Sequence, residues 1–140
     1  MTGSEGRLDN VVAICALSRP DDIERCLQSL ADQTRLPSRI VIVDASAGDE
    51  TAARIRELQD IIPPVPVNHV TATPGLTRQR NIAVNEAADC DVVHFLDDDV
   101  ACEPGYLEGI VGGIREGSGR SRLRSGRSHR ERVGELALAA

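Results

Sequence analysis

Short apolar runs alternate with amphipathic segments along the first hundred residues of the chain. Four runs rich in valine and isoleucine predict buried strands, at residues 10–17, 39–43, 65–70 and 91–96. The segments between them have apolar residues at helical spacing and predict helices over 21–32, 50–60 and 76–88. Strands that alternate with helices in this way indicate an α/β fold, with a mainly parallel sheet covered by helices on both faces.

The helical periodicity also predicts which side chains are buried. On the first helix these are Ile23, Cys26, Leu27 and Leu30, and on the second they are Ala52, Ile55 and Leu58. Pro66 lies inside the third apolar run, and because proline cannot donate to a sheet ladder, it favours an edge position for that strand.

Three adjacent aspartates, Asp97-Asp98-Asp99, directly follow the apolar run 91–96. Two carboxylates about 4 Å apart repel by about 4 kcal/mol at the effective dielectric constant near a protein surface. A hard cation such as Mg²⁺, Mn²⁺ or Ca²⁺ would relieve this repulsion, since these ions take oxygen ligands. The alternative is a solvated acidic turn.

Polar residues also follow the other predicted strands. Ser18 and Arg19 come after the first strand and Asp44 ends the second, so both lie at the same sheet edge as the three aspartates. Ligands of open α/β sheets bind outside this edge. The helix over 76–88 adds Arg78 and Arg80 in its first turns. Acidic residues and arginines together suit a diphosphate bound through Mg²⁺ or Mn²⁺.

Residues 8 to about 110 resemble the nucleotide-sugar-binding half of a family 2 glycosyltransferase, which has the GT-A fold. The resemblance is carried by five pieces in the expected order, which are Ser18-Arg19-Pro20, Leu27-Gln28-Ser29-Leu30-Ala31-Asp32-Gln33, Val41-Ile42-Val43-Asp44-Ala45-Ser46, Pro74-Gly75-Leu76-Thr77-Arg78-Gln79-Arg80-Asn81, and Phe95-Leu96-Asp97-Asp98-Asp99 followed by Pro104-Gly105-Tyr106-Leu107.

The resemblance implies inverting transfer of a sugar from a nucleoside diphosphate sugar to an acceptor hydroxyl, with a carboxylate as the base. It implies that Asp44 contacts the base or ribose, and that Arg80 and Asn81 line the same pocket. Asp97-Asp98-Asp99 would be the DXD motif, with Asp97 near the ribose and Asp99 on Mn²⁺ or Mg²⁺. The expected donor-binding residues are therefore Ser18, Arg19, Asp44, Arg78, Arg80, Asn81, Asp97 and Asp98, and the expected metal ligands are Asp97 and Asp99.

Several of these residues have a plainer interpretation. Asp44 could instead cap the following helix through an Asp-Ala-Ser turn. Arg78 and Arg80 could be solvated charges on a helix face. His94 lies inside a predicted strand and is interpreted as a hydrogen-bonded structural histidine, whereas His69 is assigned no role.

The composition changes near Ile114. Residues 1–114 hold nine arginines and nineteen acidic residues. Residues 115–140 hold seven arginines and three acidic residues, and they are rich in glycine and serine. We expect a flexible N-terminus at 1–7, a partial domain at 8–114 and a disordered tail at 115–140. The tail could be a basic arm for nucleic acid or acidic lipid, or the product of a shifted reading frame.

The family pattern continues beyond the aspartates with further strands, an acceptor-binding half and the catalytic base. Nothing after Tyr106 resembles these parts, so the sheet is expected to be incomplete at its C-terminal side, with an uncovered edge. We therefore expect donor binding, and little or no transfer by this chain alone. The acceptor class, whether glycan, lipid or small molecule, stays open.

Composition bears on the other function classes. Phe95 and Tyr106 are the only aromatic residues, which argues against a stacking platform for nucleic acid. The sequence contains no lysine, which argues against a haloacid-dehalogenase-like phosphatase, and no P-loop motif is present. A non-catalytic binding module remains the main alternative. The absence of apolar spans and of a signal pattern favours a cytoplasmic protein with reduced cysteines, and peripheral association with the inner face of the membrane stays open.

Overall fold

The computed structural model describes residues 9–59, 65–115 and 135–139. In chain order the elements are β1 (Asn10–Ala16), α1 (Pro20–Ala31), β2 (Arg39–Asp44), α2 (Glu50–Gln59), β3 (Val67–Thr71), α3 (Leu76–Glu86), β4 (Val92–Asp97), α4 (Tyr106–Arg115) and β5 (Glu135–Ala139). The predicted alternation of strands and helices is therefore confirmed.

The five strands form one sheet in the order β3-β2-β1-β4-β5. The first four are parallel, and β1 is central, with β2 on one side and β4 on the other. β3 lies at the edge, as Pro66 predicted. The chain adds β2 and β3 on one side of β1 and then crosses to place β4 on the other side. The strand order therefore reverses between β1 and β4.

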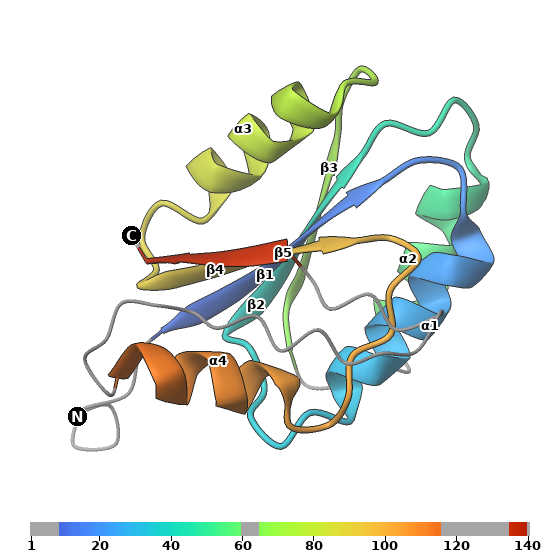
Figure 1. Ribbon diagram of the computed structural model, residues 1–140. Coiled ribbons are helices and arrows are strands. Elements are labelled where there is room, and N and C mark those ends of the chain that lie inside the picture. Colours follow the sequence, from blue (N-terminus) through green and yellow to red (C-terminus); the bar gives the residue numbers. More distant parts are fainter. Residues whose placement is uncertain (1–8, 60–64, 116–134, 140) are drawn as a thin grey trace.

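Helices cover both faces of the sheet (Figure 1). α1, α2 and α4 pack on one face, against side chains such as Ile14 and Ile42, whereas α3 packs on the opposite face, against Val11 and Val43. α1 begins with a proline at its first position and two aspartates in its first turn, as helix N-termini favour. Its four predicted core residues are all buried.

Two details differ from the predicted core. On α2 the buried residue of the first turn is Thr51, because Thr51, Ile55 and Leu58 lie on one face, and Ala52 is only half-buried. The first strand ends at Ala16 rather than Leu17, whose side chain is half-exposed. The remaining boundaries shift by one to two residues.

The C-terminal part holds two elements that the sequence analysis did not anticipate. α4 has Leu107 and Val111, four residues apart, as buried residues. Glu135–Ala139 form β5, which pairs antiparallel with β4. Within the expected tail, Arg115 closes α4, and residues 135–139 form β5, whose apolar run differs from the arginine-rich stretch before it. β5 is the outermost strand on the β4 side of the sheet. Residues 1–7 and 116–134 lie outside the described part of the chain.

None of the helices in the described residues is long and apolar enough to cross a membrane.

Candidate functional site

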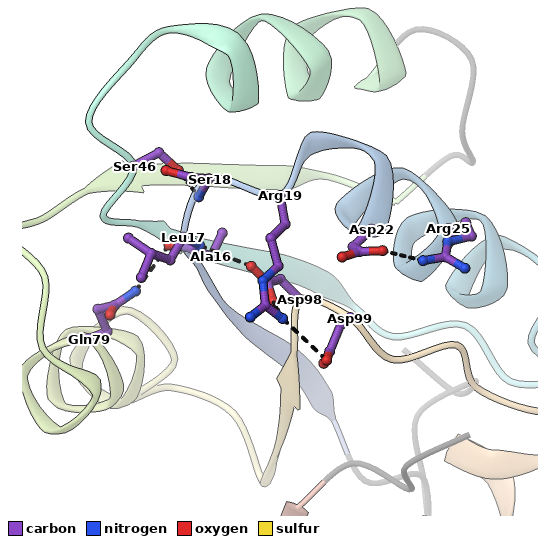
Figure 2. Close-up of polar contacts among 10 residues, drawn as sticks. All are labelled: Ala16, Leu17, Ser18, Arg19, Asp22, Arg25, Ser46, Gln79, Asp98 and Asp99. Carbon is purple, nitrogen blue, oxygen red and sulfur yellow. Dashed lines mark hydrogen bonds and ion pairs between the residues drawn. The ribbon is translucent and has the colours of Figure 1, made fainter. Parts of the chain in front are cut away.

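The loops after β1 and β4 meet at the carboxyl edge of the sheet (Figure 2). β1 and β4 are paired in register up to Cys15 and Asp97, so residues 17–19 and the three aspartates leave the sheet side by side. This is the point where the strand order reverses, and open α/β sheets bind their ligands at such a point. The sequence prediction that these residues share one edge is confirmed.

Asp98 joins the two loops. Its Oδ2 accepts a hydrogen bond from the backbone N–H of Leu17 at 3.0 Å, and its side chain is nearly fully buried. Burial raises the pKa of Asp98 above the usual aspartate value, while the Leu17 amide and the Arg19 charge act in the opposite direction. Asp98 therefore holds the β1 loop against β4 rather than pointing into open solvent.

Asp99 and Arg19 form the exposed part of the edge. The Nη1 of Arg19 lies 3.2 Å from Asp99 Oδ2 and 3.7 Å from Asp98 Oδ1. About half of each of the Arg19 and Asp99 side chains is exposed, so the pair contributes at most about 1 kcal/mol to stability. Asp97 ends β4 and is partly buried. Within the described residues, no three His, Cys, Asp or Glu side chains gather as a metal site.

Ser18 has a left-handed backbone, with φ of 53°. A residue other than glycine in this region costs about 1 kcal/mol or more, so it persists only where contacts fix it. Its N–H donates to Ser46 Oγ at 2.7 Å, and the N–H of Ser46 donates to Asp44 Oδ1 at 2.9 Å. The β2 loop thereby fixes the turn that carries Arg19.

Asp44 is 4% exposed, and both of its oxygens have partners within the protein. Oδ1 accepts from the N–H of Ser46, so the predicted turn forms, although α2 begins only at Glu50, and Oδ2 lies 2.8 Å from Nε2 of His69. Leaving His69 without a role was therefore wrong. Pairing between β2 and β3 brings the two residues together from 25 positions apart, and the sequence alone contains no signal of that register.

α3 places its first turns at the same edge through Gln79, a residue that the sequence analysis did not single out. Gln79 is 5% exposed, and its Nε2 donates to the carbonyl oxygens of Ala16 at 3.3 Å and Val43 at 3.1 Å. The amide thus ties α3 to the ends of both β1 and β2. No local pattern in the sequence signals this tie, because it depends on how α3 packs against the sheet.

The other predicted residues of α3 are placed as follows. The Arg80 guanidinium lies over the ring of Phe95 on β4, 6.0 Å from its centroid. Arg78 is exposed and donates to the hydroxyl of Thr73 in the preceding loop, and Asn81 is also exposed. The structure thus brings Arg80 toward β1 and β4, whereas Arg78 and Asn81 lie at the surface.

His94 is buried, at 1% exposure, as predicted for a core position. In the described part of the chain, however, neither ring nitrogen has a hydrogen-bond partner, so the interpretation as a hydrogen-bonded histidine is wrong. Burial lowers the pKa of His94 to about 4, with a smaller effect from the charge of Arg35. The ring is therefore neutral at physiological pH.

All four cysteines are free. Cys15 lies at the end of β1, and burial raises the pKa of its thiol to about 11. Because the thiolate is the nucleophilic form, Cys15 is not a candidate nucleophile at neutral pH.

A family model described as glycosyl transferase family 2 matches residues 11–120. No curated protein matches the chain. Among solved structures, residues 1–349 of TarS from S. aureus in complex with UDP-GlcNAc align with a TM-score of 0.65 and 22% identity, over 84% of this chain and 38% of that one.

Two further structures are similar. The mannosyltransferase PcManGT from Pyrobaculum calidifontis, in complex with GDP-Man and Mn²⁺, aligns with a TM-score of 0.66 and 21% identity over 78% of this chain and 32% of that one. GalNAc-T7 with UDP, GalNAc and Mn²⁺ aligns with a TM-score of 0.69 and 19% identity, over 79% of this chain and 21% of that one. At these identities the likeness shows a shared fold, the predicted GT-A fold. This chain spans between about a fifth and two fifths of the length of these proteins.

Proposed function

Because this chain belongs to glycosyl transferase family 2, we propose that the carboxyl edge of its sheet binds a nucleoside diphosphate sugar together with Mn²⁺ or Mg²⁺. The observation that carries the proposal is the meeting of residues 17–19 with Asp97-Asp98-Asp99 where the strand order reverses. Similar folds bind UDP, UDP-GlcNAc or GDP-Man, two of them with Mn²⁺, according to their descriptions.

The residues at this edge fit a divalent cation that is shared with a diphosphate. Mg²⁺ in such sites is bound by one or two carboxylates, with substrate phosphate oxygens and water as the other ligands. Asp99, with an exposed carboxylate, would be the main protein ligand, and Asp97 the second. When bound, the cation would stabilise negative charge on the departing diphosphate as a Lewis acid.

The surrounding residues then have distinct tasks. Arg19 and Arg80 would supply positive charge for the diphosphate and its nucleoside, and Arg78 and Asn81 would lie at the outer rim. Asp98 would position the two loops through the Leu17 amide. Asp44 would line the nucleoside pocket while it holds Ser46, because a carboxylate with two hydrogen bonds still has acceptor sites left.

The reaction that we propose for the family fold is inverting transfer of the sugar to an acceptor hydroxyl. We assign no catalytic base among the described residues, and the acceptor is a matter for experiment. A haloacid-dehalogenase-like phosphatase is not supported, because the acidic triplet follows the fourth strand of the chain and no lysine is present.

Replacing Asp99 by alanine tests the proposed metal site. In titration calorimetry with UDP and with GDP, we expect wild-type binding that requires Mn²⁺ or Mg²⁺, and at least a tenfold loss of affinity in Asp99→Ala, equivalent to about 1.4 kcal/mol. Glu57→Ala removes an exposed carboxylate from α2 and should leave the affinity unchanged. Nucleotide binding that needs no metal and has the same affinity in the wild type and in Asp99→Ala would contradict the assignment of Asp99.

A further inference from the structure

We propose that Arg19 alternates between two anionic partners, Asp99 when the metal is absent and the diphosphate when metal and nucleotide are bound. Arg19 would thereby disfavour binding of the metal alone and favour binding of metal and diphosphate together. The inference rests on the proposed function and adds to it a competition between a guanidinium and a metal ion for one carboxylate.

Among the ion pairs of the described residues near the start of α1, Arg19 pairs with the aspartates that follow β4 and not with those of α1. The two aspartates that open α1 have arginine partners of their own, since Arg25 pairs with Asp22 and Arg54 with Asp21. Arg19 instead crosses from the start of α1 to Asp99, which follows β4 80 positions later in the chain (Figure 2). Its guanidinium therefore neutralises the carboxylate that we assign to the metal.

The two aspartates near Arg19 differ in whether their side chains can move. Asp98 is buried and accepts the Leu17 N–H, so it stays in place as part of the loop junction. Asp99 is 45% exposed and the Arg19 side chain 53% exposed, so their contact can break without opening the core. Exposed ion pairs of this kind are weak. Arg19 can therefore leave Asp99 for another anionic partner at little cost in free energy.

A divalent cation on Asp99 would repel a guanidinium that stays 3.2 Å from the same carboxylate. The diphosphate offers Arg19 another partner, because guanidinium groups form bidentate hydrogen bonds with phosphate oxygens. The backbone of Arg19 is held by the turn at Ser18, which Ser46 fixes, so only the side chain has to move.

Arg19→Gln separates the two roles because it should change two affinities in opposite directions. We expect Mn²⁺ alone, followed by the electron paramagnetic resonance of the free ion, to bind about three- to tenfold more tightly to the variant than to the wild type. We expect the affinity for UDP or GDP at saturating Mn²⁺, followed by calorimetry, to fall about tenfold. Arg25→Gln removes the same charge from α1, the helix that Arg19 precedes, and should change neither affinity by more than about twofold.

Arg19→Lys is the conservative variant, and it also serves if Arg19→Gln fails to fold by circular dichroism. It should keep the wild-type affinity for Mn²⁺ alone, since the charge is retained, and recover only part of the nucleotide affinity, since lysine cannot bind two phosphate oxygens side by side. A lost charge that merely destabilised the fold would weaken both affinities together.

Unchanged or weaker binding of Mn²⁺ alone to Arg19→Gln would overturn the inference while leaving the proposed function in place. Conversely, a folded wild type that binds no nucleotide at any Mn²⁺ concentration would refute the proposed function. The comparison of Mn²⁺ alone would then still decide whether Arg19 and the metal compete for Asp99.

Discussion

Replacing His94 by leucine is expected to raise the free energy of unfolding at pH 7 by about 1–2 kcal/mol. The wild-type ring is buried with no hydrogen bond to either nitrogen within the described residues, and a buried polar group without partners costs about this much. Leucine fills a similar volume and has no polar atom. Urea unfolding followed by circular dichroism measures the change.

The same substitution should also flatten the pH dependence of stability. The pKa of His94 is about 4 in the folded protein and about 6.5 in the unfolded chain, so between these values the unfolded state binds the extra proton. Stability contributed by the neutral ring is present above about pH 6.5 and is lost as the pH falls toward 4, in total about 3 kcal/mol. The variant should lack that loss.

His69→Leu provides the contrast, because His69 has a partner. Its Nε2 lies 2.8 Å from a buried oxygen of Asp44, and leucine would leave that oxygen without its hydrogen bond. We expect the free energy of unfolding to fall by about 1 kcal/mol. If both substitutions change stability in the same direction, hydrogen bonding does not explain the difference between the two histidines.

Gln79→Glu is expected to cost about 3 kcal/mol or more at pH 7 and to abolish nucleotide binding. The buried amide donates to two carbonyl oxygens, and a carboxylate at that place has no proton to donate and repels both of them. α3 would lose its tie to β1 and β2, and with it the position of Arg80.

Gln79→Leu separates charge from hydrogen bonding at this site. It removes the donor without adding a charge, so we expect a smaller loss of about 1–3 kcal/mol. Thermal unfolding ranks the two variants. Gln59→Glu at the end of α2 is the exposed control: its amide donates to the carbonyl oxygen of Val67 at 3.3 Å but lies in contact with solvent, so we expect a loss below about 1 kcal/mol. Equal effects at positions 79 and 59 would show that Gln79 does not support the edge.

The strands and helices were largely predictable because their signals are local. Alternating apolar runs and helical spacing are present in the sequence itself, and the four buried residues of α1 follow from that spacing alone. β5 was missed because its four apolar residues were averaged into a tail dominated by arginine, glycine and serine. Its pairing with β4 depends on contacts that no local pattern specifies.

The candidate site was predictable at the level of the sheet edge and less so at the level of single contacts. Parallel strands bring their carboxyl ends together, which was enough to group Arg19 with the three aspartates. The partners of Asp44 and Gln79 depend on strand register and on the seating of α3. These are outcomes of packing across long sequence separations, so composition and spacing do not reveal them.

The central position of β1 has a consequence for hydrogen exchange. β1 is paired on both sides along nearly its whole length, so its amides should exchange with deuterium only when the whole domain unfolds. The turn at residues 17–19 begins directly after it, and there the amide of Ser18 depends on one serine hydroxyl. The slowest-exchanging amides, those of β1, therefore lie next to the amides of the candidate site. Protection gained on ligand binding can thus be read at the turn, with the preceding strand as the internal standard.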